Sequence, residues 1–242
     1  RHKSWMATAA ALALAAVVMV GIVLSQSAKV KLQADRANAE RDFLVSVFEA
    51  AGADRPKDKR PSIEDIVEQA TQRLTTQNGL PDALRADLLL TLAKVARSVG
   101  AYDRALALLD RAEPALEHSY GSDDAAWWDA KVLRASVLVD MSRRPEAIAL
   151  LDPLRAQLSA RHDRAGIAGL VLLGDALLHQ GRIDEGLGLT RRAVAIAQAQ
   201  AGDMPDEFLA ASIDEASQLM DARRFKEALE RSDATLALWH RQ

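Results

Sequence analysis

Hydrophobic residues form one unbroken run near the start of the chain. Trp5–Leu24 is apolar apart from Thr8 and one glycine, and no charged residue occurs from Ser4 to Ala28. Twenty residues of helix extend about 30 Å, the thickness of a bilayer's hydrocarbon core. We therefore predict that residues 1–28 are a transmembrane segment with a basic flank. The alternative is a secretory signal peptide with small residues at Ser25–Ala28, but the apolar run is longer than such peptides need.

The pattern changes after the apolar run, and residues 29–61 are predicted to be a juxtamembrane helix and linker. Lys29–Asp42 is polar and contains no helix breaker. It leads into Phe43–Ala51, whose apolar positions share one helical face. Ala53–Pro61 is charged and carries two prolines, which is typical of a loop.

A helix is predicted to begin after Ser62. A serine side chain is a preferred N-cap, and Glu64 and Asp65 in the first turn complement the helix dipole. Asn78-Gly79 is expected to end this helix, and Pro81 to open the next. The apolar residues of the helix share one face: Ile63, Ile66, Val67, Ala70 and Leu74.

From about Pro81 onward one pattern occurs four times, with three features at constant spacing. A small residue recurs at intervals of 42, 39 and 42 residues, at Ala105, Ala147, Gly186 and Ala228. Five residues before it lies a turn position, occupied by Gly100, Ser142, Gly181 and Arg223. Twelve residues before it lies a second small residue, at Ala93, Ala135, Gly174 and Ala216.

This pattern resembles the tetratricopeptide repeat, a pair of helices joined by a glycine turn. The two small positions correspond to repeat positions 8 and 20, where the paired helices cross closely. Position 27 is occupied by Ala112, Leu154, Ala193 and Thr235. The resemblance implies an all-α fold for residues 62–242, an α–α superhelix of four hairpins centred near residues 105, 147, 186 and 228, following the transmembrane helix.

The repeats also depart from the family's pattern. Ser142 and Arg223 replace the turn glycine, Arg144 stands where an aromatic is usual, and the period exceeds the usual 34 or so residues. Pro114 and Pro153 fall within the predicted second helices of the first two repeats, where each is expected to kink or end the helix.

Composition supports packed helices and excludes several kinds of chemistry. Aromatic residues make up only 4% of the chain, and alanine and leucine dominate. The absence of cysteine excludes disulfides, thiolate metal sites and a cysteine nucleophile. A net charge of -3 provides no basic field for a phosphate backbone, so nucleic acid is not an expected partner.

No arrangement of residues predicts catalysis, a cofactor site or a metal site in this chain. Gly186-Leu187-Gly188 lacks the third glycine and the preceding strand of a dinucleotide-binding loop. His162-Asp163-Arg164 has the composition of a kinase catalytic loop in the wrong order, without the downstream motifs. His118, His179 and His240 are scattered, with no pair of histidines four residues apart and no acidic partner at ligand spacing.

Trp127 and Trp128 form an unusual pair in a chain with few aromatic residues. We expect them to pack the first helix of the second repeat against its neighbours. The alternative is that one of them is exposed and anchors a ligand peptide.

A protein or peptide ligand is the partner that this repeat architecture implies. In the tetratricopeptide family the first helix of each pair lines a concave groove. Counting the family's groove positions onto this chain implies the candidate peptide-binding residues Asp87, Leu90, Lys94, Arg97, Asp129, Val132, Ser136, Asp140, Asp175, His179, Ser217 and Asp221. The same count also includes Ser98, Val139, Ala168, Val171, Leu178, Ala210, Ile213 and Met220. The alternative is that this surface faces solvent or another copy of the chain in a homo-oligomer.

The whole chain also resembles the C-terminal half of bacterial membrane-bound serine/threonine protein kinases. The resemblance rests on the order of segments and on the stretches RDFLVSVFEAAGADRP and SIEDIVEQATQRL, which lead into the repeats. It implies a cytoplasmic kinase domain upstream, a single pass through the inner membrane at Trp5–Leu24, and periplasmic repeats. The cations after the span, such as Lys29 and Lys31, indicate the opposite orientation by the positive-inside rule.

Three functions fit these features. The first is a non-catalytic interaction or sensor module of a membrane-bound kinase, and the second is the sensor region of a membrane-anchored transcription regulator. The third is a free-standing envelope scaffold. The chain starts with Arg1 rather than methionine, so we expect a processed chain or a piece of a longer protein.

Overall fold

The computed structural model describes residues 38, 41, 42, 45, 62–76, 80–200, 202 and 205–239. The chain divides into two compact units, Arg1–Pro61 and Ser62–Gln242. The predicted membrane span Trp5–Leu24 and the predicted loop Ala53–Pro61 lie outside the described residues. Among the residues that are described, no helix is long and apolar enough to cross a membrane. In the predicted juxtamembrane segment, residues 38, 41, 42 and 45 are helical.

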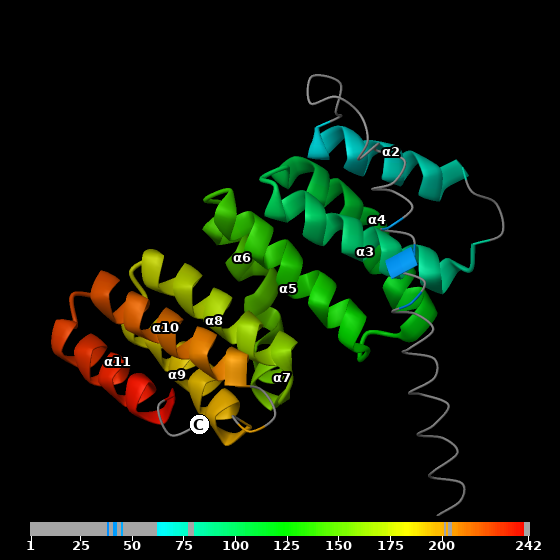
Figure 1. Cartoon of the computed structure of the whole chain (residues 1–242). Helices are drawn as coiled ribbons and strands as arrows, with labels where there is room; N and C mark the ends of the chain where they lie inside the picture. Colours follow the sequence, from blue (N-terminus) through cyan, green and yellow to red (C-terminus); the bar gives the residue numbers. More distant parts are fainter. Residues whose placement is uncertain are drawn as a thin grey trace, which may run out of the picture. The chain divides into compact units, whose positions relative to one another are not determined.

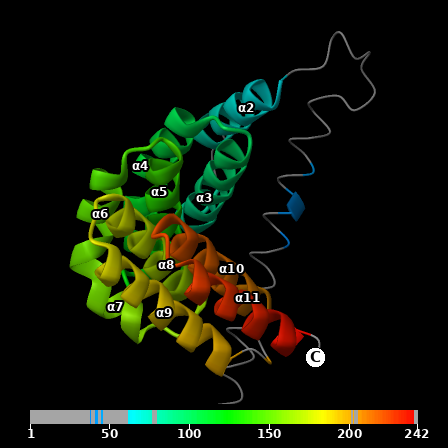
Figure 2. The ribbon, with the colours of Figure 1, turned by 90° about the vertical axis from the view of Figure 1, so that its left-hand side faces the viewer.

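The second unit is a stack of helical hairpins (Figure 1). All regular secondary structure in the described residues is helical, which confirms the all-α prediction for the repeats. The helices are α2 (Ile63–Thr76), α3 (Asp82–Ser98), α4 (Tyr102–Tyr120), α5 (Ala125–Asp140), α6 (Arg144–Leu151), α7 (Arg155–Ala160), α8 (Arg164–His179), α9 (Ile183–Ala199), α10 (Pro205–Asp221) and α11 (Phe225–Trp239). Figures 1 and 2 show the hairpins side by side in sequence order, from α3 and α4 in green to α10 and α11 in orange and red.

Helix α2 begins with a reciprocal capping box. The Ser62 hydroxyl accepts a hydrogen bond from the Asp65 backbone N–H at 3.1 Å, and the Asp65 carboxylate accepts from the Ser62 N–H at 3.0 Å. The hydrogen bond from the Ser62 side chain, followed by that from its backbone, lowers the pKa of Asp65. The predicted stripe is confirmed at Val67, Ala70 and Leu74, which are fully buried.

The four hairpin turns share one backbone conformation, although only two of them contain glycine. Each turn residue has a positive φ: 79° at Gly100, 60° at Ser142, 86° at Gly181 and 59° at Arg223. The next residue's N–H donates to the carbonyl five residues back, with distances of 2.9, 2.7, 3.0 and 2.8 Å for the pairs Ala101–Ala96, Arg143–Leu138, Arg182–Leu177 and Arg224–Leu219. This is the Schellman motif, and its hydrogen bonds hold Ser142 and Arg223 in a conformation that costs a non-glycine residue about 1–2 kcal/mol.

The small residues lie where the paired helices cross, as the sequence predicts. A Cβ atom added to Gly186 would lie 2.4 Å from the Gly174 carbonyl oxygen, and one added to Gly174 would lie 2.7 Å from the Gly186 oxygen. The backbones of α8 and α9 therefore touch, and no side chain fits between them. The corresponding alanines of the first two hairpins are fully buried: Ala93, Ala105, Ala135 and Ala147.

The two prolines in second helices have different effects. Pro153 ends α6, because a 3-10 turn at Asp152–Leu154 separates α6 from α7. Proline lacks the N–H that a continuous helix needs, so the helix restarts after it. Pro114 does not end α4, which continues through it to Tyr120. Its ring is exposed, so the carbonyl left without an N–H partner can bind water.

The touching backbones predict opposite effects of two substitutions in α9. Gly186→Ala should lower the free energy of unfolding by about 1–3 kcal/mol, because the new methyl group overlaps the α8 backbone. In Gly188→Ala, two residues away, the new methyl group meets no atom within 4 Å. This substitution should raise the free energy of unfolding by about 0.5–1 kcal/mol, because alanine has the higher helix propensity. Chemical denaturation monitored by circular dichroism measures both changes. Equal effects of the two substitutions would contradict the close crossing.

Candidate functional site

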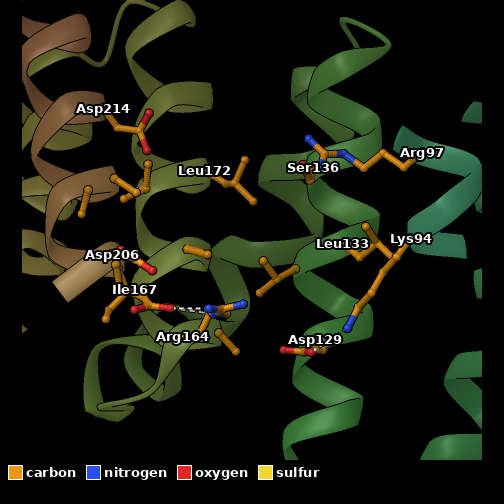
Figure 3. Close-up of a pocket in the computed structure, with 17 residues that line it drawn as sticks. Lys94, Arg97, Asp129, Leu133, Ser136, Arg164, Ile167, Leu172, Asp206 and Asp214 are labelled. Atoms are coloured by element: carbon orange, nitrogen blue, oxygen red, sulfur yellow. Dashed lines mark hydrogen bonds and ion pairs between the residues drawn. The ribbon is translucent and has the colours of Figure 1, made fainter. Parts of the chain in front are cut away.

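The first helices of the four hairpins enclose a groove of about 580 Å³. Its lining comes from α3, α5, α8 and α10 (Figure 3). The apolar lining residues are Val132, Leu133, Ala165, Ile167, Ala168, Val171, Leu172, Ala210 and Ala211. Much of the groove surface is thus hydrophobic, and charged residues line its borders.

The α3 border of the groove is basic. The Lys94 ammonium lies 3.0 Å from the Asp129 carboxylate, and the Arg97 Nε donates to Asp140 at 2.7 Å. Half of the Lys94 side chain remains exposed, and the Arg97 side chain is 39% exposed. Both cations are therefore oriented by α5 and remain accessible from the groove.

The α10 border is acidic. Arg164 Nε, at the start of α8, donates to Glu207 at 2.8 Å, and this hydrogen bond lowers the pKa of Glu207. Asp206 and Asp214 also line the groove, and neither forms an ion pair with any residue that the structure describes. Partial desolvation, with a smaller contribution from the charge of Asp175, raises the pKa of Asp214. Figure 3 shows Asp206 and Asp214 opposite Lys94 and Arg97.

Five of the twelve candidate residues predicted from sequence line this groove: Lys94, Arg97, Asp129, Val132 and Ser136. Of the eight further positions of the same count, Ala168, Val171 and Ala210 also line it, whereas Ser98, Val139, Leu178, Ile213 and Met220 do not. The groove therefore lies among the first helices, where the repeat pattern predicts a ligand surface.

The other seven candidate residues lie outside the groove lining. Asp87 is buried and accepts a hydrogen bond from the Tyr120 hydroxyl at 2.7 Å, and Leu90 is buried beside it in α3. Asp140 pairs with Arg97 at the end of α5. Asp175 and His179 contact one another in α8, with 3.3 Å between carboxylate and Nδ1. Ser217 and Asp221 are exposed on α10.

The count of groove positions omitted several residues that line the groove. Arg164, Asp206 and Glu207 lie in the first turns of α8 and α10, before the first counted position. Asp214 and Leu172 each follow a counted position by one residue. The charged residues in the first turns of these helices were thus the signal available in the sequence. The count of groove positions begins later in each helix and therefore omits them.

Trp127 and Trp128 are structural residues of α5, as expected. Both are buried, and their rings meet edge to face with centroids 5.1 Å apart. The Lys131 ammonium lies 4.9 Å from the centre of the Trp127 ring, and the Arg161 guanidinium lies at the same distance from Trp128. Neither tryptophan lines the groove.

Within the described part of the chain, no group of three histidine, aspartate or glutamate side chains is placed to hold a metal ion. The carboxylates that line the groove belong to α5 (Asp129) and α10 (Asp206, Glu207 and Asp214). The groove is thus a surface with charged residues at its two sides.

Comparison with known proteins identifies the fold. No protein-family model matches the chain, and no curated protein matches its sequence. Many solved structures resemble it. Three of them are a Rap protein complexed with Competence and Sporulation Factor, BtubC from P. vanneervenii, and kinesin light chain TPR-like repeats from Podosopora anserina.

The TM-scores of these three structures are 0.60, 0.60 and 0.56, at 14%, 15% and 20% sequence identity. The matches cover 82%, 86% and 86% of this chain, and 49%, 91% and 93% of the other chains, respectively. This chain therefore spans about half of the Rap protein. At such identities the likeness concerns the fold alone, which is a tetratricopeptide-like stack of helical hairpins.

The raised pKa of Asp214 predicts how one groove substitution changes stability with pH. A carboxyl group whose pKa is raised in the folded state favours folding most when it is protonated. This contribution to stability is lost as the pH rises from the ordinary pKa of 3.8 through the folded-state pKa. Asp214→Asn should therefore raise the melting temperature at pH 7, and the gain should shrink as pH falls through the folded pKa of Asp214 and be absent below its ordinary value of 3.8. Melting curves of both proteins across this pH range provide the measurement. A gain of equal size at every pH would exclude the desolvated carboxylate as its cause.

Proposed function

We propose that this chain is a non-catalytic protein–protein interaction module that binds a peptide segment of its partner in the groove. The observation that carries this proposal is the groove itself, in which an apolar surface lies between a basic and an acidic border. The Rap protein of similar fold is complexed with a factor, which supports binding as a function of this architecture. A surface of this kind fits a chain segment with apolar side chains and charged residues of both signs.

The charge pattern favours one arrangement of the bound segment. Its acidic side chains lie near Lys94 and Arg97, where they compete with Asp129 and Asp140 for the cations. Its basic side chains lie near Asp206 and Asp214, and its apolar side chains contact the hydrophobic lining between them. Such complementarity orients a ligand and increases its association rate.

The proposal extends to the chain's setting, on the grounds of its sequence. In this proposal Trp5–Leu24 anchors the chain in the bacterial inner membrane, and the repeats lie in the periplasm. A cytoplasmic serine/threonine kinase domain precedes the membrane span in the same protein, and the repeats transmit ligand binding to it. The supporting observation is the resemblance of Arg41–Ala51 and the following repeats to those kinases. An upstream winged-helix sequence would replace this proposal with that of a transcription regulator.

A peptide-display selection on the full chain tests binding in the groove. Random twelve-residue peptides should yield binders, and Ala210→Arg should weaken the best of them at least tenfold because the new side chain fills the groove. Ala195→Arg is the matched control, since Ala195 is exposed on α9 away from the groove. Fluorescence anisotropy with the labelled peptide gives both affinities. Equal weakening by the two variants, or a selection without binders, would refute the proposal.

Reporter fusions after Gln242 test the proposed orientation. Alkaline phosphatase folds actively only outside the cytoplasm, so its fusion should be active in intact cells. A green fluorescent protein fusion exported through the same route should be dark. The reversed pair of results would place the repeats in the cytoplasm, as the positive-inside rule indicates.

A further inference from the structure

The last hairpin carries an apolar face that no helix of the described chain covers. In α11, Phe225 and Leu229 are each 63% exposed and Leu236 is 56% exposed, whereas in α10 Ile213 and Met220 are 57% and 58% exposed. In a helical solenoid the terminal repeat ordinarily presents a polar outer face to water. We call these five residues the end face; a cluster of large exposed apolar side chains of this kind marks an interaction surface.

The preceding hairpin shows what such a face binds. The residues of α9 that lie 42 positions before Leu229 and Leu236 are Leu187 and Val194, which are 0% and 2% exposed. Leu187 packs in one core cluster with Leu219 of α10 and Ala228 of α11. Thr190 lies between Leu187 and Val194, and its hydroxyl donates to Gln218 of α10 at 2.7 Å. The residues 42 positions before Ile213 and Met220 are Val171 and Leu178, and both are buried as well. At Ile213, Met220, Leu229 and Leu236 the end face therefore has the form of a helix-binding surface, whereas Ile183, the counterpart of Phe225, is 40% exposed.

The charges beside the end face identify its occupant. In α9 the corresponding flanking positions are Asp184 and Arg191, and both form ion pairs with the next hairpin, to Arg224 at 3.0 Å and to Glu227 at 2.7 Å. In α11 these positions are Lys226 and Asp233, which are exposed and of opposite sign. They lie seven residues apart and therefore on the same edge of the apolar stripe.

We propose that the end face binds the end face of a second copy of this chain, with the two α11 helices antiparallel about a two-fold axis. In such an isologous contact, residue i meets residue j of the partner copy and residue j meets residue i. A two-fold axis across antiparallel helices places the same edge of each stripe together, so Lys226 of each copy lies near Asp233 of the other. If the two-fold axis passes midway between Phe225 and Leu236, Lys226 of one copy and Asp233 of the other are offset by about 3 Å along the helix direction.

A parallel arrangement does not give these ion pairs. It would place Lys226 against the opposite edge of the stripe, where Ala228 and Thr235 are buried. The antiparallel dimer also leaves the groove open, since none of the end-face residues lines it. The proposal thus goes beyond peptide binding and does not depend on it.

Cysteine cross-linking tests the contact and its direction in the full chain. The chain contains no cysteine, so Phe225→Cys and Leu236→Cys each introduce a single thiol. In membranes from cells that express both variants with different tags, a short bis-maleimide should link the two variants to each other and should link neither to itself. Ala107→Cys, on the exposed side of α4, is the control and should remain unlinked. Absence of the mixed dimer, or stronger linkage of each variant to itself, would overturn the proposal.

Charge reversal provides a second test that leaves the apolar face unchanged. Lys226→Asp alone and Asp233→Lys alone place like charges together, and each should raise the dimer dissociation constant about tenfold, as measured by analytical ultracentrifugation. An equimolar mixture of the two variants should restore the dimer, because each then faces an opposite charge. Asp123→Lys, in the exposed loop before α5, should have no effect. A monomeric wild-type chain, or variants that dimerise like wild type, would overturn the proposal, and the former result would favour a different helical partner.

Discussion

The structure depends on the close approach of two helix backbones within each hairpin. Between α8 and α9 this approach leaves no room for a Cβ atom at Gly174 or Gly186. Small residues at these positions fix the separation of the paired helices, and the turn conformation at Gly181 fixes their direction. When four such hairpins stack, their first helices line the same groove. The groove is therefore a consequence of the crossing rather than a separate feature.

Buried polar groups hold successive hairpins in register. Glu113 of α4 lies 2.6 Å from Lys131 of α5 and also pairs with Arg134. Glu215 of α10, only 2% exposed in its side chain, lies 2.7 Å from Arg231 and 3.3 Å from Arg191. Desolvation offsets much of the attraction within such pairs, so they contribute more to the specificity of the stack than to its stability. Removing one partner would leave a buried charge unpaired and would disturb the groove through its supporting helices.

The repeats were predictable because their constraint is local. Small residues and turns at fixed spacing identified Ala105 and Gly186 as crossing points, and both are buried. The left-handed conformation of Arg223 was not evident from its side chain, since the Schellman hydrogen bonds impose it. The residues that form the acidic border were missed for a different reason. Asp206 and Asp214 reach the groove only through the packing of α10 against α8, and a count along one helix does not contain that relation.

Amide hydrogen exchange tests the role of the close crossings most directly, because it reports the stability of each helix within the stack. If close crossings hold the hairpins together, the amides of α8 and α9 around Gly174 and Gly186 should exchange most slowly in the chain. Exchange should become faster toward α2 and α11, which have a neighbouring helix on fewer sides. Exchange around Gly174 as rapid as that in α11 would contradict this role, because it would show that the crossing does not stabilise the stack.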